Sequence, residues 1–209
     1  MKELLRCYQR KKKEIKNRLN DFRRNYKKDG RHIFSELCFC LLTPQAEAVE
    51  CDKAIKELKK TGLLFNGQPK DISPYLKAAR FLNKKSEFIV NARRLFKKNG
   101  CFCIKEHIDG KDVFRTREWL VENIKGMGYK EASHFLRNIG LGKDLAILDI
   151  HILRNLKDYR VIKKLPRSLS KKGYLNIEEK VKGFCKEIKI PMDELDLLLW
   201  SRETGFVFK

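Results

Sequence analysis

A pair of helical patterns joined by a glycine-containing turn restricts the fold of this chain more than any other feature. The first pattern covers residues 116–124 (TREWLVENI), with Thr116 in the position of an N-cap. The second follows Gly128, and its apolar residues recur at the spacing of one helical face: Ala132, Phe135, Leu136 and Ile139. Gly126 and Gly128 lie in the turn between the two patterns. Residues 116–140 are therefore predicted to form a tight helical hairpin.

The turn of this hairpin has the properties of a phosphate-binding site. Glycine permits positive φ and lets the backbone approach a ligand closely, so we expect Gly126 and Gly128 to need conformations that a Cβ disfavours. The first N–H groups of the following helix have no partners inside that helix and lie at the positive end of its dipole. An anion is stabilised at such a helix start. The pattern therefore predicts that the hairpin binds phosphate through its backbone.

Lys130 and Asp149 are the ionisable residues that the patterns place beside this turn. Lys130 falls in the first turn of the second helix, on the side away from its apolar face. Asp149 directly precedes an apolar helical pattern that starts at Ile150, which is the position of an N-cap. An amine that points into a cleft is a candidate nucleophile. A carboxylate that is held in place because it caps a helix is a candidate electrostatic stabiliser. The residues alone also permit a lysine that only contacts phosphate and an aspartate that only caps a helix.

The spacing of these residues resembles that of a known superfamily. Ile-x-Gly-x-Gly-x-Lys-x-Ala followed by Leu-Asp-x-His is similar to the helix-hairpin-helix DNA glycosylases, which include the endonuclease III-like enzymes, and the likeness covers roughly residues 31–160. The resemblance implies that the hairpin grips a DNA phosphate, that Lys130 attacks the sugar and that Asp149 assists. Leu-Thr-Pro-Gln-Ala also resembles a turn of those enzymes whose Gln enters the duplex, so the resemblance implies that Gln45 is a DNA-binding residue, whereas the residues alone also permit a glutamine that is merely exposed in a turn.

The end of the chain narrows this resemblance. The short length, the LLLWSRETG segment and a final lysine look like the second type of 8-oxoguanine DNA glycosylase/AP lyase, known chiefly from archaea. That family implies a bifunctional repair enzyme in which Lys attacks C1′ and the strand is cleaved 3′ to the abasic site by β-elimination. It also implies a base pocket that contains Trp200 and Lys209 together with a stacking phenylalanine. Phe81 is our choice for that phenylalanine, and Phe88 is the alternative.

Three other functions fit the same residues. They are an endonuclease III-like glycosylase for another damaged base, a glycosylase that activates water and has no lyase activity, and a non-catalytic helix-hairpin-helix protein that binds DNA. The 48 Lys and Arg against 27 Asp and Glu give a formal charge of +21, which favours a polyanionic partner in every case. We expect a monomer that binds double-stranded DNA containing a damaged base.

Cysteine usage and hydropathy give expectations about cofactors and cellular location. Seven cysteines include two C-x-C pairs, but only Cys185 follows Asp149. The four-cysteine iron–sulfur loop that many endonuclease III-like enzymes carry after this aspartate cannot form in the same way. We therefore expect no cofactor and no metal. The sequence lacks a run of about 18 apolar residues and a signal-peptide pattern, so we expect a cytoplasmic, nucleoid-associated protein with no membrane contact.

The remaining patterns predict an all-α fold of two helical lobes, with the hairpin at the mouth of the cleft between them. Residues 1–209 are expected to form a single glycosylase unit. Further helices are expected at residues 1–28, 31–42, 44–60, 74–79, 84–98, 177–188 and 191–205. Residues 163–176 (KKLPRSLSKKGYLN) look like a basic linker.

Overall fold

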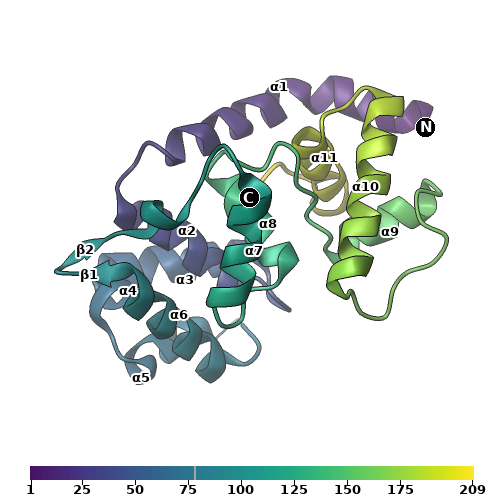
Figure 1. Cartoon of the computed structure of the whole chain (residues 1–209). Helices are drawn as coiled ribbons and strands as arrows, with labels where there is room; N and C mark the ends of the chain where they lie inside the picture. The colour runs from purple at the N-terminus through teal and green to yellow at the C-terminus, as the bar shows by residue number, and fades with distance from the viewer. Residues whose placement is uncertain (78) are drawn as a thin grey trace.

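Helices make up most of this chain, and they range from single turns to the long helix at its N-terminus (Figure 1). The computed structural model describes residues 1–77 and 79–209. The elements are α1 (Lys2–Asn25), α2 (Gly30–Leu42), α3 (Ala48–Lys60), α4 (Leu63–Asn66), α5 (Pro69–Ile72), η1 (Ser73–Leu76), α6 (Leu82–Phe96), β1 (Lys97–Lys98), β2 (Cys101–Phe102), η2 (Ile104–His107), α7 (Val113–Asn123), α8 (Tyr129–Asn138), α9 (Ile150–Asp158), α10 (Lys171–Ile188) and α11 (Met192–Thr204). The two strands form one antiparallel ribbon of two-residue strands. The predicted all-α class is confirmed.

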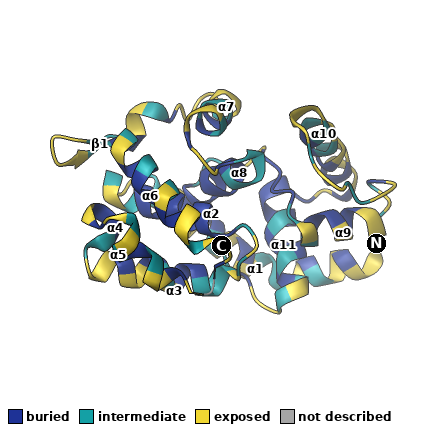
Figure 2. Cartoon of the chain, turned by 90° about the horizontal axis from the view of Figure 1, so that it is seen from below, coloured by how far each residue is buried: buried dark blue, intermediate teal, exposed yellow. Residues whose placement is uncertain are grey.

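Buried apolar side chains gather in two clusters, one for each lobe. The first cluster is built around α2, which is buried on nearly every side, and includes residues of α3, α6 and α8. The second combines α9, α10 and α11 with the buried face of α1. Helix α1 runs along the top of both lobes in Figure 1, and α8 lies between the lobes when the molecule is seen from below (Figure 2).

The predicted hairpin consists of α7 and α8, but α7 begins earlier than expected. Asp112 is the N-cap of α7, because its carboxylate accepts a hydrogen bond from the Arg115 N–H at 2.9 Å. Thr116 is therefore not the N-cap, and its hydroxyl instead donates to the Asp109 carbonyl at 3.1 Å. The apolar face of α8 is confirmed, since all four predicted residues are fully buried: Ala132, Phe135, Leu136 and Ile139.

The prediction of a linker over residues 163–176 is wrong in its second half. Ser170 caps α10 by accepting a hydrogen bond from the Gly173 N–H at 3.2 Å, and the helix begins at Lys171. The glycine of its first turn has low helix propensity, and the lysines lie at the positive end of the helix dipole, where acidic residues are the usual signal of a start. Tyr174 nevertheless anchors the turn, because its buried hydroxyl donates to the Ala146 carbonyl at 2.6 Å.

Candidate active site

A cleft of about 760 Å³ lies where the two lobes meet. Its wall includes the turn between α2 and α3, one face of α8, the start of α9, the C-terminal half of α11 and the end of the chain. These segments are far apart in the sequence, and the two clusters bring them together. The cleft therefore lies where the sequence predicts it, beside the second helix of the hairpin.

Lys130 and Asp149 both line this cleft. The Lys130 side chain is 22% exposed, and its Nζ lies 3.4 Å from Glu131 Oε1 and 3.5 Å from the Thr43 hydroxyl. Asp149 is the N-cap of α9, as predicted, and its Oδ1 accepts a hydrogen bond from the Ile152 N–H at 2.8 Å. The cap bond fixes the direction of the carboxylate. The structure thus places a primary amine and an oriented carboxylate in one cavity.

Helix α8 presents a stripe of three basic side chains to the cleft. Lys130, His134 and Arg137 line it together, and their spacing of four and three residues puts them on one helical face. Sequence reasoning found only Lys130, although the same spacing rule would have found the other two. On α11, the Asp196 carboxylate lies 3.1 Å from Arg137 Nη1. Burial raises the pKa of Asp196 to about 6, and Asp149 acts in the same direction while Arg137 opposes it.

Aromatic side chains close the end of the cleft near the C-terminus. Trp200 and Phe208 stack with their ring centres 6.1 Å apart and their planes 27° apart. Phe206 meets the edge of Trp200 at 5.6 Å. The structure brings Trp200 and Lys209 into one cavity as predicted. Phe206 and Phe208 were missed, although their alternation just before Lys209 is visible in the sequence.

The last residue is held by its side chain. Lys209 Nζ lies 2.7 Å from Asp52 Oδ1 on α3 and 3.1 Å from Glu36 Oε1 on α2. The same ammonium stands 4.5 Å from the centre of the Phe39 ring. Burial alone would lower the pKa of Lys209, but Glu36 and Asp52 together raise it above its ordinary value. The chain end is therefore anchored in the first lobe by a cation between two carboxylates, and nothing in the local sequence predicted this.

Gln45 and Phe81 lie on adjoining turns. Gln45 lines the cleft, and its side-chain oxygen accepts a hydrogen bond from Arg80 at 3.1 Å. Ala46 and Ala79 join the two turns by a β-bridge. Both Gln45 and Phe81 have positive φ, 53° and 58°, a conformation that costs a non-glycine residue about 1 kcal/mol. The Phe81 ring is 60% exposed and is not part of the cleft wall. Such strained, exposed residues are typical of ligand-contacting turns.

The glycines of the hairpin turn differ from each other. Gly126 has φ +84°, as expected, and an added Cβ would overlap the ring of Phe88. Gly128 has φ −97° and ψ −176°, which any residue adopts, so the expectation of an unusual conformation there is wrong. Its N–H donates a hydrogen bond to Glu131 Oε2 at 3.2 Å. Phe88, the alternative stacking residue, packs behind the hairpin.

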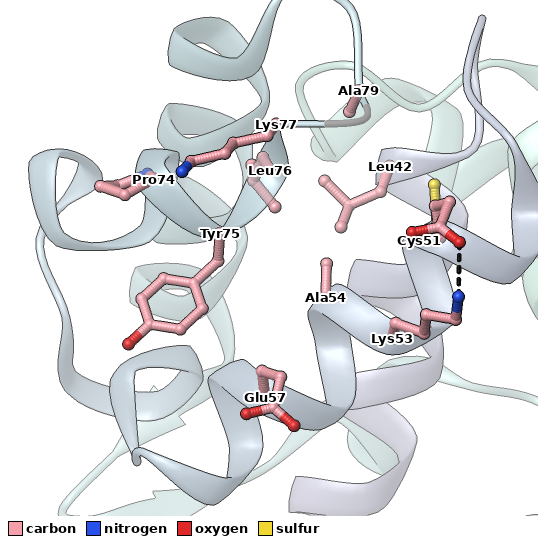
Figure 3. A pocket seen from close by; sticks show the side chains of 11 residues that line it. Leu42, Cys51, Lys53, Ala54, Glu57, Pro74, Tyr75, Leu76, Lys77 and Ala79 are labelled. Atoms are coloured by element: carbon pink, nitrogen blue, oxygen red, sulfur yellow. Dashed lines mark hydrogen bonds and ion pairs between the residues drawn. The ribbon is translucent and has the colours of Figure 1, made fainter.

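A second hollow of about 320 Å³ lies between α3 and η1 (Figure 3). Leu42, Ala54 and Leu76 point toward its centre, while Lys53 at the rim pairs with Glu50 at 2.7 Å. Its centre is thus aliphatic, in contrast to the charged wall of the cleft. We assign the candidate active site to the cleft.

Metal ligands do not gather around the cleft or elsewhere in the described part of the chain. No group of three His, Cys, Asp or Glu side chains there could hold a metal ion, and the cysteines are free. The absence of a cofactor remains a prediction. None of the helices that the structure describes is long and apolar enough to cross a membrane.

Two helical lobes with a lysine and a capping aspartate in the cleft beside a glycine hairpin are the arrangement of the helix-hairpin-helix DNA glycosylases. Comparison with known proteins gives the family. Residues 15–190 match the family model described as 8-oxoguanine DNA glycosylase, and the chain belongs to this family. The resemblance inferred from the sequence is confirmed.

Relatives match along nearly the whole length of the chain. The 8-oxoguanine DNA glycosylase/AP lyase of Fusobacterium nucleatum is 46% identical, and the match covers 99% of this chain and 96% of the relative. The enzyme of the same name from Methanocaldococcus jannaschii is 40% identical, over 93% of this chain and 91% of the relative.

Solved structures agree with the sequence matches. The crystal structure of the 8-oxoguanine DNA glycosylase of Thermotoga maritima has a TM-score of 0.88 and 37% identity, and the match covers 100% of this chain and 97% of that one. The Methanocaldococcus jannaschii 8-oxoguanine glycosylase/lyase, in complex with 15mer DNA containing 8-oxoguanine, also has a TM-score of 0.88, with 36% identity and 100% of both chains covered.

Proposed function

We propose that this protein is a bifunctional repair enzyme that excises 8-oxoguanine from double-stranded DNA and cleaves the strand at the resulting abasic site. One observation carries the proposal: Lys130 and Asp149 line one cleft between the lobes, beside the hairpin, in a chain of the 8-oxoguanine DNA glycosylase family. The charge of +21 supports binding to a polyanion. The enzyme acts as a monomer on DNA in the cytoplasm, at the nucleoid, and uses no cofactor.

Substrate binding begins at the hairpin. Backbone N–H groups around Gly126 and at the start of α8 contact a phosphate near the lesion, while the Gly128 N–H donates to Glu131 in the free protein. Such contacts position the duplex without reading its sequence. The damaged nucleotide then rotates out of the helix into the cleft, because its reacting atoms are inaccessible inside the stack. Gln45 enters the space that the nucleotide leaves. Trp200, in the cleft wall, stacks on one face of the base. Phe81 lies outside that wall, exposed on the turn that adjoins Gln45, and we assign it to the other face of the base on the strength of the family resemblance.

The chemistry starts at Lys130. Its neutral amine attacks C1′, a new C–N bond forms, and the bond from C1′ to the base breaks with its electron pair leaving on the base, which then takes a proton. Opening of the sugar ring gives a Schiff base between Lys130 and C1′. Removal of a proton from C2′ then expels the 3′ phosphate, so the strand breaks 3′ to the lesion. Asp149 stabilises the positive charge that develops on the sugar and helps to move protons.

Base selection depends on the N7 edge. Guanine presents a lone pair at N7, whereas 8-oxoguanine presents an N–H. A hydrogen-bond acceptor in the pocket therefore pairs with the lesion and faces another acceptor in normal guanine, a buried mismatch of roughly 1–3 kcal/mol. The main-chain oxygens of Lys209 supply this acceptor. The ion pairs of its side chain with Glu36 and Asp52 hold the chain end in place.

Borohydride trapping tests the assignment of Lys130. Reduction of the imine should leave a covalent protein–DNA adduct with the wild type and none with Lys130→Gln, while DNA binding survives the loss of one charge. Lys125→Gln is the matched control, because Lys125 is an exposed lysine of the same hairpin, and it should still be trapped. Trapping of Lys130→Gln would exclude Lys130 as the nucleophile. Duplexes with other damaged bases distinguish this enzyme from an endonuclease III-like one.

A further inference from the structure

We propose that His134 is a positioning residue for base recognition, whose imidazole N–H holds a main-chain oxygen of Lys209 in the direction of the flipped base. This inference rests on the proposed function of the cleft and names the residue that makes the chain end a rigid acceptor. It follows from burial, from missing hydrogen bonds and from the neighbours of the ring.

The His134 ring is buried without a hydrogen-bond partner. The residue is only 6% exposed, and it lines the cleft. Neither Nδ1 nor Nε2 makes a hydrogen bond with the residues that the structure describes. Buried polar groups without partners are rare in folded proteins. An unpartnered imidazole in the wall of a ligand cavity therefore indicates a partner in the working state.

The chain end is a partner that lies beside the ring. Phe39 packs edge-on against the His134 ring, with ring centres 5.6 Å apart and planes at 81°. The face of the same Phe39 lies under the Lys209 ammonium at 4.5 Å. One phenylalanine thus holds the imidazole and the last residue next to each other. The Lys209 backbone is also close enough to His134 to act on its pKa.

The surroundings of the ring keep it neutral. Burial lowers the pKa of His134 well below its ordinary value, and the nearby cations Arg137, Lys130 and Lys209 lower it further, whereas the Lys209 backbone opposes the change. A neutral imidazole has one N–H donor and one acceptor nitrogen. The donor can hold one oxygen lone pair of Lys209, which leaves another lone pair directed at the N7–H of 8-oxoguanine. Lys130, one helical turn earlier on α8, is not involved in this contact.

Two substitutions separate hydrogen bonding from packing. His134→Phe keeps an aromatic ring against Phe39 but removes the N–H, whereas His134→Gln restores a donor. Each variant is assayed under single-turnover conditions for 8-oxoguanine excision and for cleavage at a preformed abasic site, where no base is read. We expect His134→Phe to lower excision about tenfold to hundredfold and to change abasic-site cleavage by less than about threefold. His134→Gln should recover most of the excision rate.

Two controls make the outcome decisive. His107→Phe is matched, because His107 stacks on Trp119 at 4.4 Å, away from the cleft, and both activities should be unchanged. In a chain that lacks Lys209, adding His134→Phe should slow 8-oxoguanine excision little beyond the effect of the deletion alone, because His134 and Lys209 act as one unit. Equal losses in both assays, a Gln variant as poor as the Phe variant, or additive losses would overturn the proposal. A wild type that does not excise 8-oxoguanine would instead overturn the proposed function.

Discussion

At the scale of single residues, the site combines structural and chemical roles in the same side chain. Asp149 caps α9 through one carboxylate oxygen and lines the cleft. The proposed chemistry uses the negative charge of Asp149, whereas capping the helix needs only a hydrogen-bond acceptor. The two roles can therefore be separated by a substitution that keeps the acceptor and removes the charge.

Asp149→Asn should fold normally and lower excision of 8-oxoguanine by about 100-fold or more, the scale of losing one major electrostatic stabiliser. Asp112→Asn is the matched control, because Asp112 caps α7 with a bond of 2.9 Å against 2.8 Å at Asp149. Single-turnover excision and thermal unfolding measure both effects. If Asp149→Asn were as active as Asp112→Asn, Asp149 would be a cap and nothing more.

Asp196 gives a prediction about pH. Its pKa rises from 3.8 to about 6 on folding, so as pH increases through this range the unfolded chain loses the proton first and the folded state loses stability. Asparagine does not titrate. From about pH 4 to pH 6, the free energy of unfolding of wild type should therefore fall relative to Asp196→Asn by up to about 3 kcal/mol. Urea denaturation at several pH values measures this difference, and a constant difference would contradict the raised pKa.

Two kinds of residue were named from the sequence: those with a local signature, and those given only by the family resemblance, such as Gln45, Trp200 and Lys209. Lys130 and Asp149 follow from helix starts and spacing. Asp196 and Glu203 were not identified, because their roles depend on contacts between distant elements: Asp196 meets Arg137, and the Glu203 carboxylate lies 3.9 Å from His151. Single-sequence patterns contain no information about such pairs.

At the scale of elements, the hairpin shows how far a glycine pattern can be interpreted. The turn was predicted correctly, but only Gly126 has positive φ, and the Phe88 ring also packs where a Cβ of this residue would lie. Helix starts were less predictable. The beginning of α10 depends on the Ser170 cap and on the burial of Tyr174 against another segment, and the second of these cannot be inferred from the local sequence.

Gly126→Ala should destabilise the hairpin and weaken binding to damaged and undamaged DNA alike, because the phosphate contact carries no sequence information. Positive φ costs alanine about 1 kcal/mol, and the overlap with Phe88 adds to it. Gly183→Ala is the control: Gly183 lies in α10 with nothing within 4 Å of an added Cβ, and it should gain about 0.5–1 kcal/mol of stability. Thermal unfolding and binding titrations measure both. A loss confined to lesion-containing DNA would place this turn in the base pocket.

At the scale of the whole molecule, the last residue of the chain joins the two lobes. The segment after α11 belongs to the second lobe through Val207, while the Lys209 ammonium is bound by Glu36 and Asp52 of the first. The base pocket therefore depends on the relative positions of both lobes. Sequence analysis predicted the two lobes and the cleft, but the separation of 173 residues between Lys209 and Glu36 places their pairing beyond any local pattern.

Changes at the chain end should separate anchoring from recognition. Appending Gly-Ser after Lys209 keeps the ammonium between Glu36 and Asp52 but replaces the terminal carboxylate by a peptide. We expect about tenfold to hundredfold slower 8-oxoguanine excision, with thermal stability and cleavage at a preformed abasic site nearly unchanged. Deleting Lys209 should also lower stability by about 3 kcal/mol, because the buried Glu36 loses its cation, whereas Asp52 keeps Lys56 at 2.7 Å.

Lys209→Arg is the matched variant for these two changes, since it keeps both the charge and the free chain end. It should retain more excision activity than either the extended or the shortened chain. The assays are single-turnover cleavage of duplexes that carry 8-oxoguanine or an abasic site, with unfolding followed in parallel. Excision of 8-oxoguanine at the wild-type rate by both the extended and the shortened chain would remove the C-terminus from the recognition site. The acceptor for N7–H would then have to come from another group in the wall of the cleft.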